Sequence, residues 1–153
     1  MGHVSTYLNF AGNTEEAFAY YSTIFGTSVA TLSRFSDMPD IPVAPEESSL
    51  ILNMSMPIHA GHIIMGSDMV PSLGHAVRIG NNTTVVLETD SREQADAYFA
   101  ALSDGGDEQQ RQGMGDMPWG AYWGVCLDRF GIRWMINGKT NNLMASAVYT
   151  LTI

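Results

Sequence analysis

The chain of 153 residues is long enough to bury a core in one domain without disulfide or metal crosslinks. It carries 7 basic and 16 acidic residues, a formal net charge of −9, and no run of Lys or Arg interrupts this balance. Nucleic acids and anionic membranes are bound mainly through clustered positive charge, so we expect neither as a partner.

The N-terminus and the cysteine content indicate the cellular compartment. The first residues lack the basic and apolar pattern of a signal peptide, and no segment approaches the roughly 18 apolar residues of a membrane span. Cys126 is the single cysteine, which forbids an internal disulfide and suits a reducing environment. We therefore expect a cytoplasmic protein.

The first half of the chain predicts a strand, a helix and three more strands. Residues 3–10 form a short β-rich run, HVSTYLNF. In the following segment, EEAFAYYSTIF at 15–25, apolar side chains recur at the i, i+3, i+4, i+7 spacing of an amphipathic helix. Three strand-like segments follow, at residues 28–35, 48–56 and 62–69. The loop at 36–48, rich in Pro and Asp, predicts a mobile excursion.

The second half repeats this order after a linker at 70–81. A β-rich run at 82–89 precedes a second helix, EQADAYFAALS at 93–103. Four residues of the first helix recur 78 positions later: Glu15, Ala17, Ala19 and Tyr20 become Glu93, Ala95, Ala97 and Tyr98. A weak strand at 107–112, a Gly-rich loop at 113–118 that we expect to be mobile, and two further strands at 119–128 and 132–137 complete the half.

Both helices also have matching ends. Asn13 with Glu16 and Ser91 with Gln94 fit the pattern in which side chains satisfy free backbone donors of the first turn. Gly26 and the pair Gly105 and Gly106 predict the C-terminal stops.

The repeat indicates an α+β fold built from a duplicated half. We expect two tandem βαβββ modules that form a curved mixed sheet with a concave cup, the helices lying on its outer face. A single domain would span residues 1–139, with halves of about 1–70 and 80–139, and residues 140–153 would form a C-terminal tail. The alternating sequence at the end of that tail fits either an added edge strand or a frayed end.

Three segments resemble the PhnB-like branch of the vicinal-oxygen-chelate superfamily, which includes glyoxalase I, bleomycin-resistance proteins and extradiol dioxygenases. They are YLNFAGNTEEAFAYYSTIFG at 7–26, LETDSREQADAYFAALSDGG at 87–106 and WGAYWGVCLDRFGIRWMIN at 119–137, and the resemblance covers residues 4 to about 138. It implies the paired-module fold and a homodimer.

In metal-dependent members of that superfamily, His, Gln and Glu side chains from the first and last strands of each half hold a divalent ion. The corresponding positions here are Thr6, or Tyr7 if the register shifts by one, and Thr84, Met65 and Met135. Thioethers are too soft to replace oxygen and imidazole ligands of such ions. We therefore expect no metal and no other cofactor, and the sequence leaves open whether the protein is an enzyme.

The remaining polar candidates are few. His59 and His62 have a spacing that suits one metal ion, but the HAGH sequence predicts a surface turn instead. His3 and His75 stand alone in the terminus and the linker. Glu88 lies within a predicted strand and either faces the cup, as a catalytic base or hydrogen-bond acceptor, or lies in water at the sheet edge.

Aromatic residues are concentrated near the end of the second half. Trp119, Tyr122 and Trp123 precede Trp134, and alternation predicts that Trp134 and Ile136 face the helices while Arg133 and Met135 face the cup. We expect aromatic rings to hold a flat or apolar molecule and Arg133 to bind an anionic group. The expected ligand-binding residues are Tyr7, Glu88, Trp119, Tyr122, Arg133 and Met135.

Two functions remain open at this point. The first is metal-independent binding of a small amphipathic or aromatic molecule in the cup, and the second is metal-dependent isomerase, lyase or dioxygenase chemistry with Glu88 and a histidine as ligands. Cys126 has no basic neighbour in sequence to activate it, so we expect it to be buried in the core.

Overall fold

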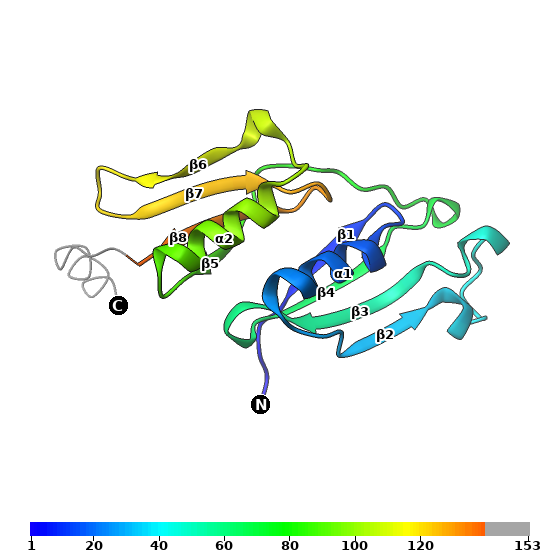
Figure 1. Cartoon of the computed structure of the whole chain (residues 1–153). Coiled ribbons are helices and arrows are strands. Elements are labelled where there is room, and N and C mark those ends of the chain that lie inside the picture. The colour runs from blue at the N-terminus through cyan, green and yellow to red at the C-terminus, as the bar shows by residue number, and fades with distance from the viewer. Residues whose placement is uncertain (140–153) are drawn as a thin grey trace. The chain divides into compact units, whose positions relative to one another are not determined.

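A computed structural model describes residues 1–139, which fall into two compact units, one ending at Arg78 and the other starting at Ile79. Each unit contains one α-helix and one four-stranded sheet (Figure 1). The predicted tail at 140–153 lies outside the described residues. No helix in residues 1–139 is long and apolar enough to cross a membrane.

Unit 1 has the predicted order of strand, helix and three strands. Its elements are β1 (Thr6–Phe10), α1 (Thr14–Phe25), β2 (Thr31–Arg34), β3 (Ile51–Pro57) and β4 (Ile63–Asp68). The strands lie in the order β1-β4-β3-β2, in which β1 runs parallel to β4 and the other pairs are antiparallel.

Unit 2 repeats the arrangement. Its elements are β5 (Val85–Glu88), α2 (Arg92–Ser103), β6 (Gln112–Asp116), β7 (Tyr122–Leu127) and β8 (Arg133–Gly138). The order β5-β8-β7-β6 matches that of unit 1, with β5 parallel to β8. Both helices have 12 residues, so the predicted duplication is confirmed. The arrangement of the two sheets around a common cup stays a prediction.

Five short 3-10 helices complete the two units. They are η1 (Phe35–Asp37), η2 (Pro45–Glu47), η3 (His59–Gly61), η4 (Pro71–Leu73) and η5 (Glu108–Gln110).

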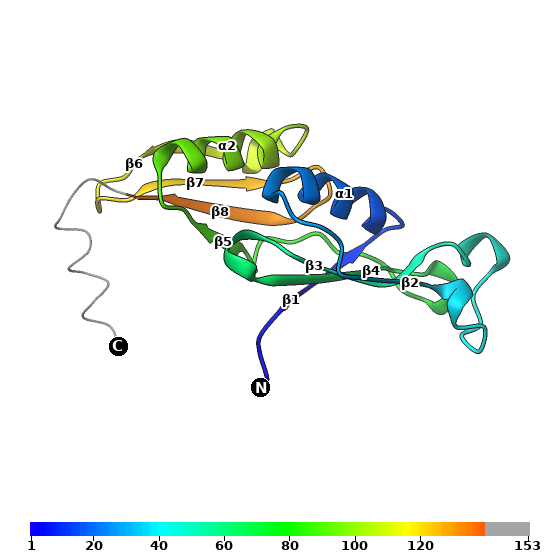
Figure 2. The same ribbon diagram turned by 60° about the horizontal axis from the view of Figure 1, so that its bottom comes forward.

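Each helix covers one face of its own sheet (Figure 2). In unit 1, Phe18 of α1 meets Phe10 of β1 edge to face, with ring centroids 6.2 Å apart. Gly66 of β4 lies beneath them, because a Cβ at that position would be 2.9 Å from the Phe18 ring. Ala17 of α1 and Ala95 of α2 are both fully buried, so small side chains let each helix approach its sheet.

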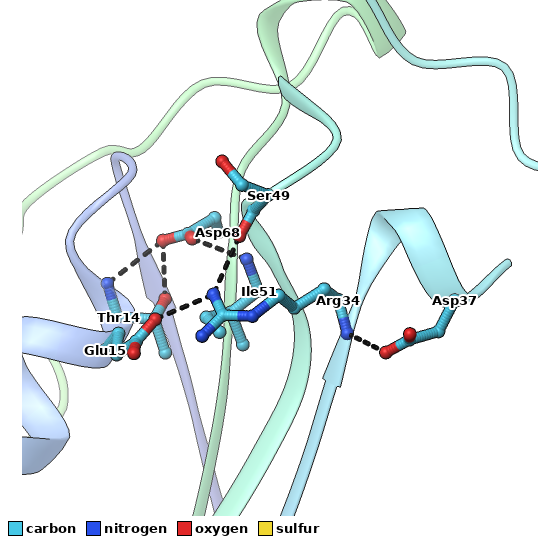
Figure 3. Close-up of polar contacts among 7 residues, drawn as sticks. All are labelled: Thr14, Glu15, Arg34, Asp37, Ser49, Ile51 and Asp68. Atoms are coloured by element: carbon cyan, nitrogen blue, oxygen red, sulfur yellow. Dashed lines mark hydrogen bonds and ion pairs between the residues drawn. The ribbon is translucent and has the colours of Figure 1, made fainter. Parts of the chain in front are cut away.

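The N-termini of the two helices are capped differently. The Ser91 side chain accepts a hydrogen bond from the Gln94 N–H at 3.1 Å, as the capping pattern predicted. The same prediction for Asn13 is wrong, since its side chain makes no capping bond. Instead, Asp68 at the end of β4 accepts from the N–H and the hydroxyl of Thr14, at 3.0 and 2.6 Å (Figure 3). A residue from the neighbouring strand thus caps α1.

The position predicted for the strand after α2 is wrong. The predicted weak strand at 107–112 contains η5, and β6 lies in the segment expected to be a mobile Gly-rich loop. Gln112–Asp116 pairs with β7 through an irregular register, with a shift between Gln112 and Gly115. Glycine has low strand propensity, so pairing with β7 rather than local preference determines this strand.

Candidate functional site

Each sheet has one face against its helix and a second face, which we call the distal face. In unit 2 the helix side is identified by Gly138, because a Cβ there would lie 3.2 Å from Ala95 of α2. Trp134 and Ile136 share this side by strand alternation, and both are fully buried, as predicted. The distal face therefore carries the alternate β8 residues Arg133, Met135 and Asn137.

Three rows of paired residues cross the distal face of unit 2. They are Glu88–Asn137–Trp123, Val86–Met135–Val125 and Arg133–Leu127. In the first row, the Asn137 amide donates a hydrogen bond to the Glu88 carboxylate at 3.0 Å. The first row is thus polar and aromatic, the second row is apolar, and the third ends in a guanidinium.

An aromatic pair adjoins the first row. Trp119, in the turn between β6 and β7, meets Trp123 at a centroid distance of 6.1 Å and an interplanar angle of 71°. Trp119 is 65% exposed, which is unusual for such a large apolar side chain. Trp119 is among the ligand-binding residues expected from the sequence, whereas Trp123 is not. The pairing of Trp123 with Asn137 across the β7–β8 hairpin places it on the Met135 side.

The distal face of unit 1 is more polar. Leu8 and Phe10 of β1 are buried on the α1 side, so Tyr7 lies on the distal face, where it is 49% exposed. Tyr7 pairs with Met65 of β4, and Met65 pairs in turn with Ser55 of β3. The Ser55 and Thr31 hydroxyls are hydrogen-bonded at 2.6 Å.

These paired modules can be compared with known proteins. The sequence profile of the family described as 3-demethylubiquinone-9 3-methyltransferase matches residues 2–137. The chain belongs to this family. A structure described as a putative 3-demethylubiquinone-9 3-methyltransferase, the PhnB protein from Bacillus cereus, superposes with a TM-score of 0.72 at 20% identity, covering 89% of this chain and 98% of that one. The resemblance to PhnB-like proteins is thereby confirmed.

Other relatives extend the PhnB-like comparison. Protein YjdN of Escherichia coli (strain K12) is 32% identical over 143 residues, or 88% of this chain and 93% of YjdN. Protein PA1353 from Pseudomonas aeruginosa superposes with a TM-score of 0.74 at 28% identity, covering 90% and 97% of the two chains. The fosfomycin resistance protein FosX from Listeria monocytogenes, in complex with Mn(II) and sulfate, shares the fold with a TM-score of 0.60 at 13% identity, covering 95% of this chain and 97% of FosX.

The positions implied for metal ligands lie on different faces of the sheets in this PhnB-like chain. Of the two alternatives on β1, Thr6 lies on the α1 side, as strand alternation with Leu8 and Phe10 requires. Its hydroxyl is hydrogen-bonded to His62 Nε2 at 2.9 Å. Tyr7 is the residue on the distal face, opposite Met65. In unit 2 the corresponding pair is Val86 and Met135, and Thr84 precedes β5.

This donor set does not fit a divalent ion that prefers oxygen and imidazole ligands. Tyr7 offers a phenol, Thr84 offers a hydroxyl, and Met65 and Met135 offer thioethers. Residues 1–139 contain no group of three or more His, Cys, Asp and Glu side chains placed to hold a metal. The residues at these positions therefore differ from the His, Gln and Glu set that the resemblance implies for metal-dependent members.

The histidines lie apart from Glu88 in the chain. His59–Gly61 forms the 3-10 turn between β3 and β4, so the predicted HAGH turn is confirmed. All four histidines precede Ile79, so unit 2, which contains Glu88, has none.

Tyr122 lies on the opposite side of the unit 2 sheet from Arg133 and Met135. Its hydroxyl donates to the Asp96 carboxylate of α2, and the Arg92 guanidinium lies 4.3 Å from its ring centroid. The hydrogen bond to Asp96 is the main cause that raises the pKa of Tyr122, and burial adds to it. The structure thus groups Glu88, Arg133 and Met135 on one sheet face, and places Tyr122 with α2.

Cys126 also belongs to the α2 side of the sheet. It pairs with Trp134 and is 1% exposed, so the expected burial is confirmed. Burial raises the pKa of the thiol to about 12, which keeps it protonated at neutral pH. A thiolate nucleophile is not available at this position.

Proposed function

We propose that this PhnB-like protein binds a small amphipathic or aromatic molecule on the distal faces of its sheets, and that it does so without a metal ion. The single observation that carries the proposal is that Met65 and Met135, at positions where metal-dependent relatives are expected to place their ligands, pair with Tyr7 and Val86. Phenol, thioether and alkyl groups suit an apolar body better than a cation.

Two further features support an amphipathic ligand. Trp119 and Trp123 offer aromatic surface next to the Glu88–Asn137 pair, so apolar and polar groups lie in one row. Flat side chains with nearby hydrogen-bonding groups are typical of small-molecule sites. Glu88 and Asn137 would then orient a donor group of the ligand, and Met135 would contact its apolar part.

The family description names a methyltransferase, and we propose binding instead. Within residues 1–139, each sheet contains a single parallel pair, β1 with β4 and β5 with β8. Gly-rich cofactor sites of the Rossmann type are built on an open, mainly parallel sheet, and this topology differs from it. The similarity to FosX with bound Mn(II) concerns the fold alone.

We also propose that the protein forms a homodimer. The edge strand β2 exposes Leu32, which is 44% accessible. An edge with unpaired backbone groups and an apolar side chain favours association with a second copy.

Metal dependence gives the test of this proposal. We expect untagged protein purified without a chelator to contain no stoichiometric metal, and its melting temperature to stay unchanged on titration with Ni²⁺, Zn²⁺, Mn²⁺ or Fe²⁺. Elemental analysis and thermal-shift measurements check both. The neighbouring exposed residue Asp90 provides the control variant, Asp90→Ala. Metal-free binding would be overturned, in favour of the metalloenzyme alternative, by a melting-temperature shift that grows with metal concentration. That shift would have to disappear in Glu88→Ala and persist in Asp90→Ala.

A further inference from the structure

Arg133 differs from the other basic residues in its surroundings. Four arginines pair with a carboxylate: Arg34 with Glu15, Arg92 with Asp116, Arg111 with Glu108 and Arg129 with Asp104. Arg78 and Lys139 are exposed, so water can solvate their charges. Arg133 is partly exposed, and within residues 1–139 its side chain makes no ion pair and donates no hydrogen bond.

Within residues 1–139 no side-chain nitrogen of Arg133 is buried without a partner, so the guanidinium reaches solvent and is open to an anion from outside the chain. The protein has 16 acidic residues, so carboxylate partners are abundant in its sequence. Arg133 also shares the distal face with Met135, two residues further along β8, and pairs with the buried Leu127 where β7 ends and β8 begins. These features suit a guanidinium that meets an anionic group of a bound molecule.

The rest of the distal face limits the shape of that molecule. From Arg133, β8 continues through Met135 to Asn137, four residues or about 13 Å along a strand. The middle of this path is apolar, because Met135 lies between Val86 and Val125. At its far end the Glu88 carboxylate accepts from Asn137. One end of the path is thus positive, the centre is apolar, and the other end is negative.

We infer that the ligand is an amphipathic monoanion. Its acidic group pairs with Arg133, its apolar body lies along Met135 and Val86, and its other end, next to Glu88 and Trp123, carries no negative charge. The inference rests on the proposed function and adds to it the charge class and the direction of the ligand. A molecule with an acidic group at both ends is disfavoured, since its second carboxylate would face Glu88.

Isothermal titration calorimetry with four probes tests this inference on the full chain. The probes are decanoate, decanedioate, decylammonium and the neutral aromatic 1-naphthol. We expect decanoate to bind saturably and more tightly than decanedioate or decylammonium. Arg133→Met keeps an apolar stem but removes the charge, and it should weaken decanoate binding about tenfold or more. The control Arg111→Met removes a positive charge from an exposed pair with Glu108, and decanoate affinity should stay unchanged.

Glu88→Gln supplies a second, independent arm. It should strengthen decanedioate binding several-fold while decanoate changes little, because only the dianion meets the Glu88 charge. Circular dichroism and thermal unfolding of each variant establish that it is folded.

The outcomes separate this inference from the proposed function. If 1-naphthol binds saturably but decanoate does not, the inference is overturned while small-molecule binding stands. The inference is also overturned if Arg133→Met binds decanoate as well as the unaltered chain does, or if decylammonium binds more tightly than decanoate. If none of the four probes binds, both the inference and the proposed function are overturned.

Discussion

Replacing Asp68 by alanine should lower the free energy of unfolding by about 3–5 kcal/mol. The carboxylate is 4% exposed and accepts three hydrogen bonds, from the N–H and hydroxyl of Thr14 and from the N–H of Ile51 at 2.8 Å. Figure 3 shows how these bonds join the start of α1 to β3 and β4. Without the carboxylate, buried donors stay unpaired and α1 loses a negative charge at its N-terminus.

Urea denaturation followed by circular dichroism measures this change. Glu15→Ala is the matched control, because Glu15 lies in the same region but forms an exposed ion pair with Arg34 at 2.7 Å. Exposed pairs contribute little, so this variant should unfold almost as the unaltered chain does. An Asp68→Ala variant no less stable than Glu15→Ala would show that water satisfies the Thr14 and Ile51 donors.

Asp128 should have a comparable effect in unit 2. Its carboxylate is 3% exposed and accepts from the N–H groups of Phe130 and Ile132, at 2.8 and 2.9 Å, and from Trp134 Nε1 at 2.9 Å. Asp128 therefore closes the β7–β8 turn and holds the Trp134 ring against the α2 side of the sheet. We expect Asp128→Ala to cost about 3–5 kcal/mol, since two buried donors and one part-buried donor lose their acceptor.

Urea denaturation monitored by tryptophan fluorescence suits this variant, because Trp134 is the ring that Asp128 contacts. Asp104→Ala provides the control: Asp104 pairs with Arg129 at 3.0 Å but is 74% exposed. We expect the control to change stability only slightly. Equal unfolding midpoints for the two variants would contradict the structural role of Asp128.

The duplicated fold could be predicted because its signals are local and repeated. The helical spacing that includes Tyr20 and Tyr98 depends on residues close together in sequence, and the structure places both helices within one residue of the predicted start. Alternation along β8 likewise predicted the burial of Trp134, since side chains of a strand point to opposite faces by geometry alone.

The errors concern contacts between distant residues. Asp68 caps α1 across 54 positions, a contact that no local capping pattern contains. The glycines of β6 have no strand preference of their own, and pairing with β7 imposes the extended backbone. A sequence examined locally contains neither fact.

The candidate site was predictable to the extent that alternation determines sheet faces. Alternation along β8 places Arg133 and Met135 on one face. The register between β5 and β8 then adds Glu88 to the same face. Tyr122 and Trp123 are adjacent, so they must lie on opposite faces, and only the register with β8 shows which one joins Met135. That register depends on the turn held by Asp128.

The central claim is that the protein binds a small molecule without a metal ion. Saturable binding in the presence of a chelator tests this claim most directly. Calorimetric titration of decanoate and 1-naphthol into the full chain should give a saturating heat for at least one of them, with the same affinity in excess EDTA as without it. The account would be contradicted if neither compound bound, or if binding disappeared in EDTA and returned on addition of Mn²⁺.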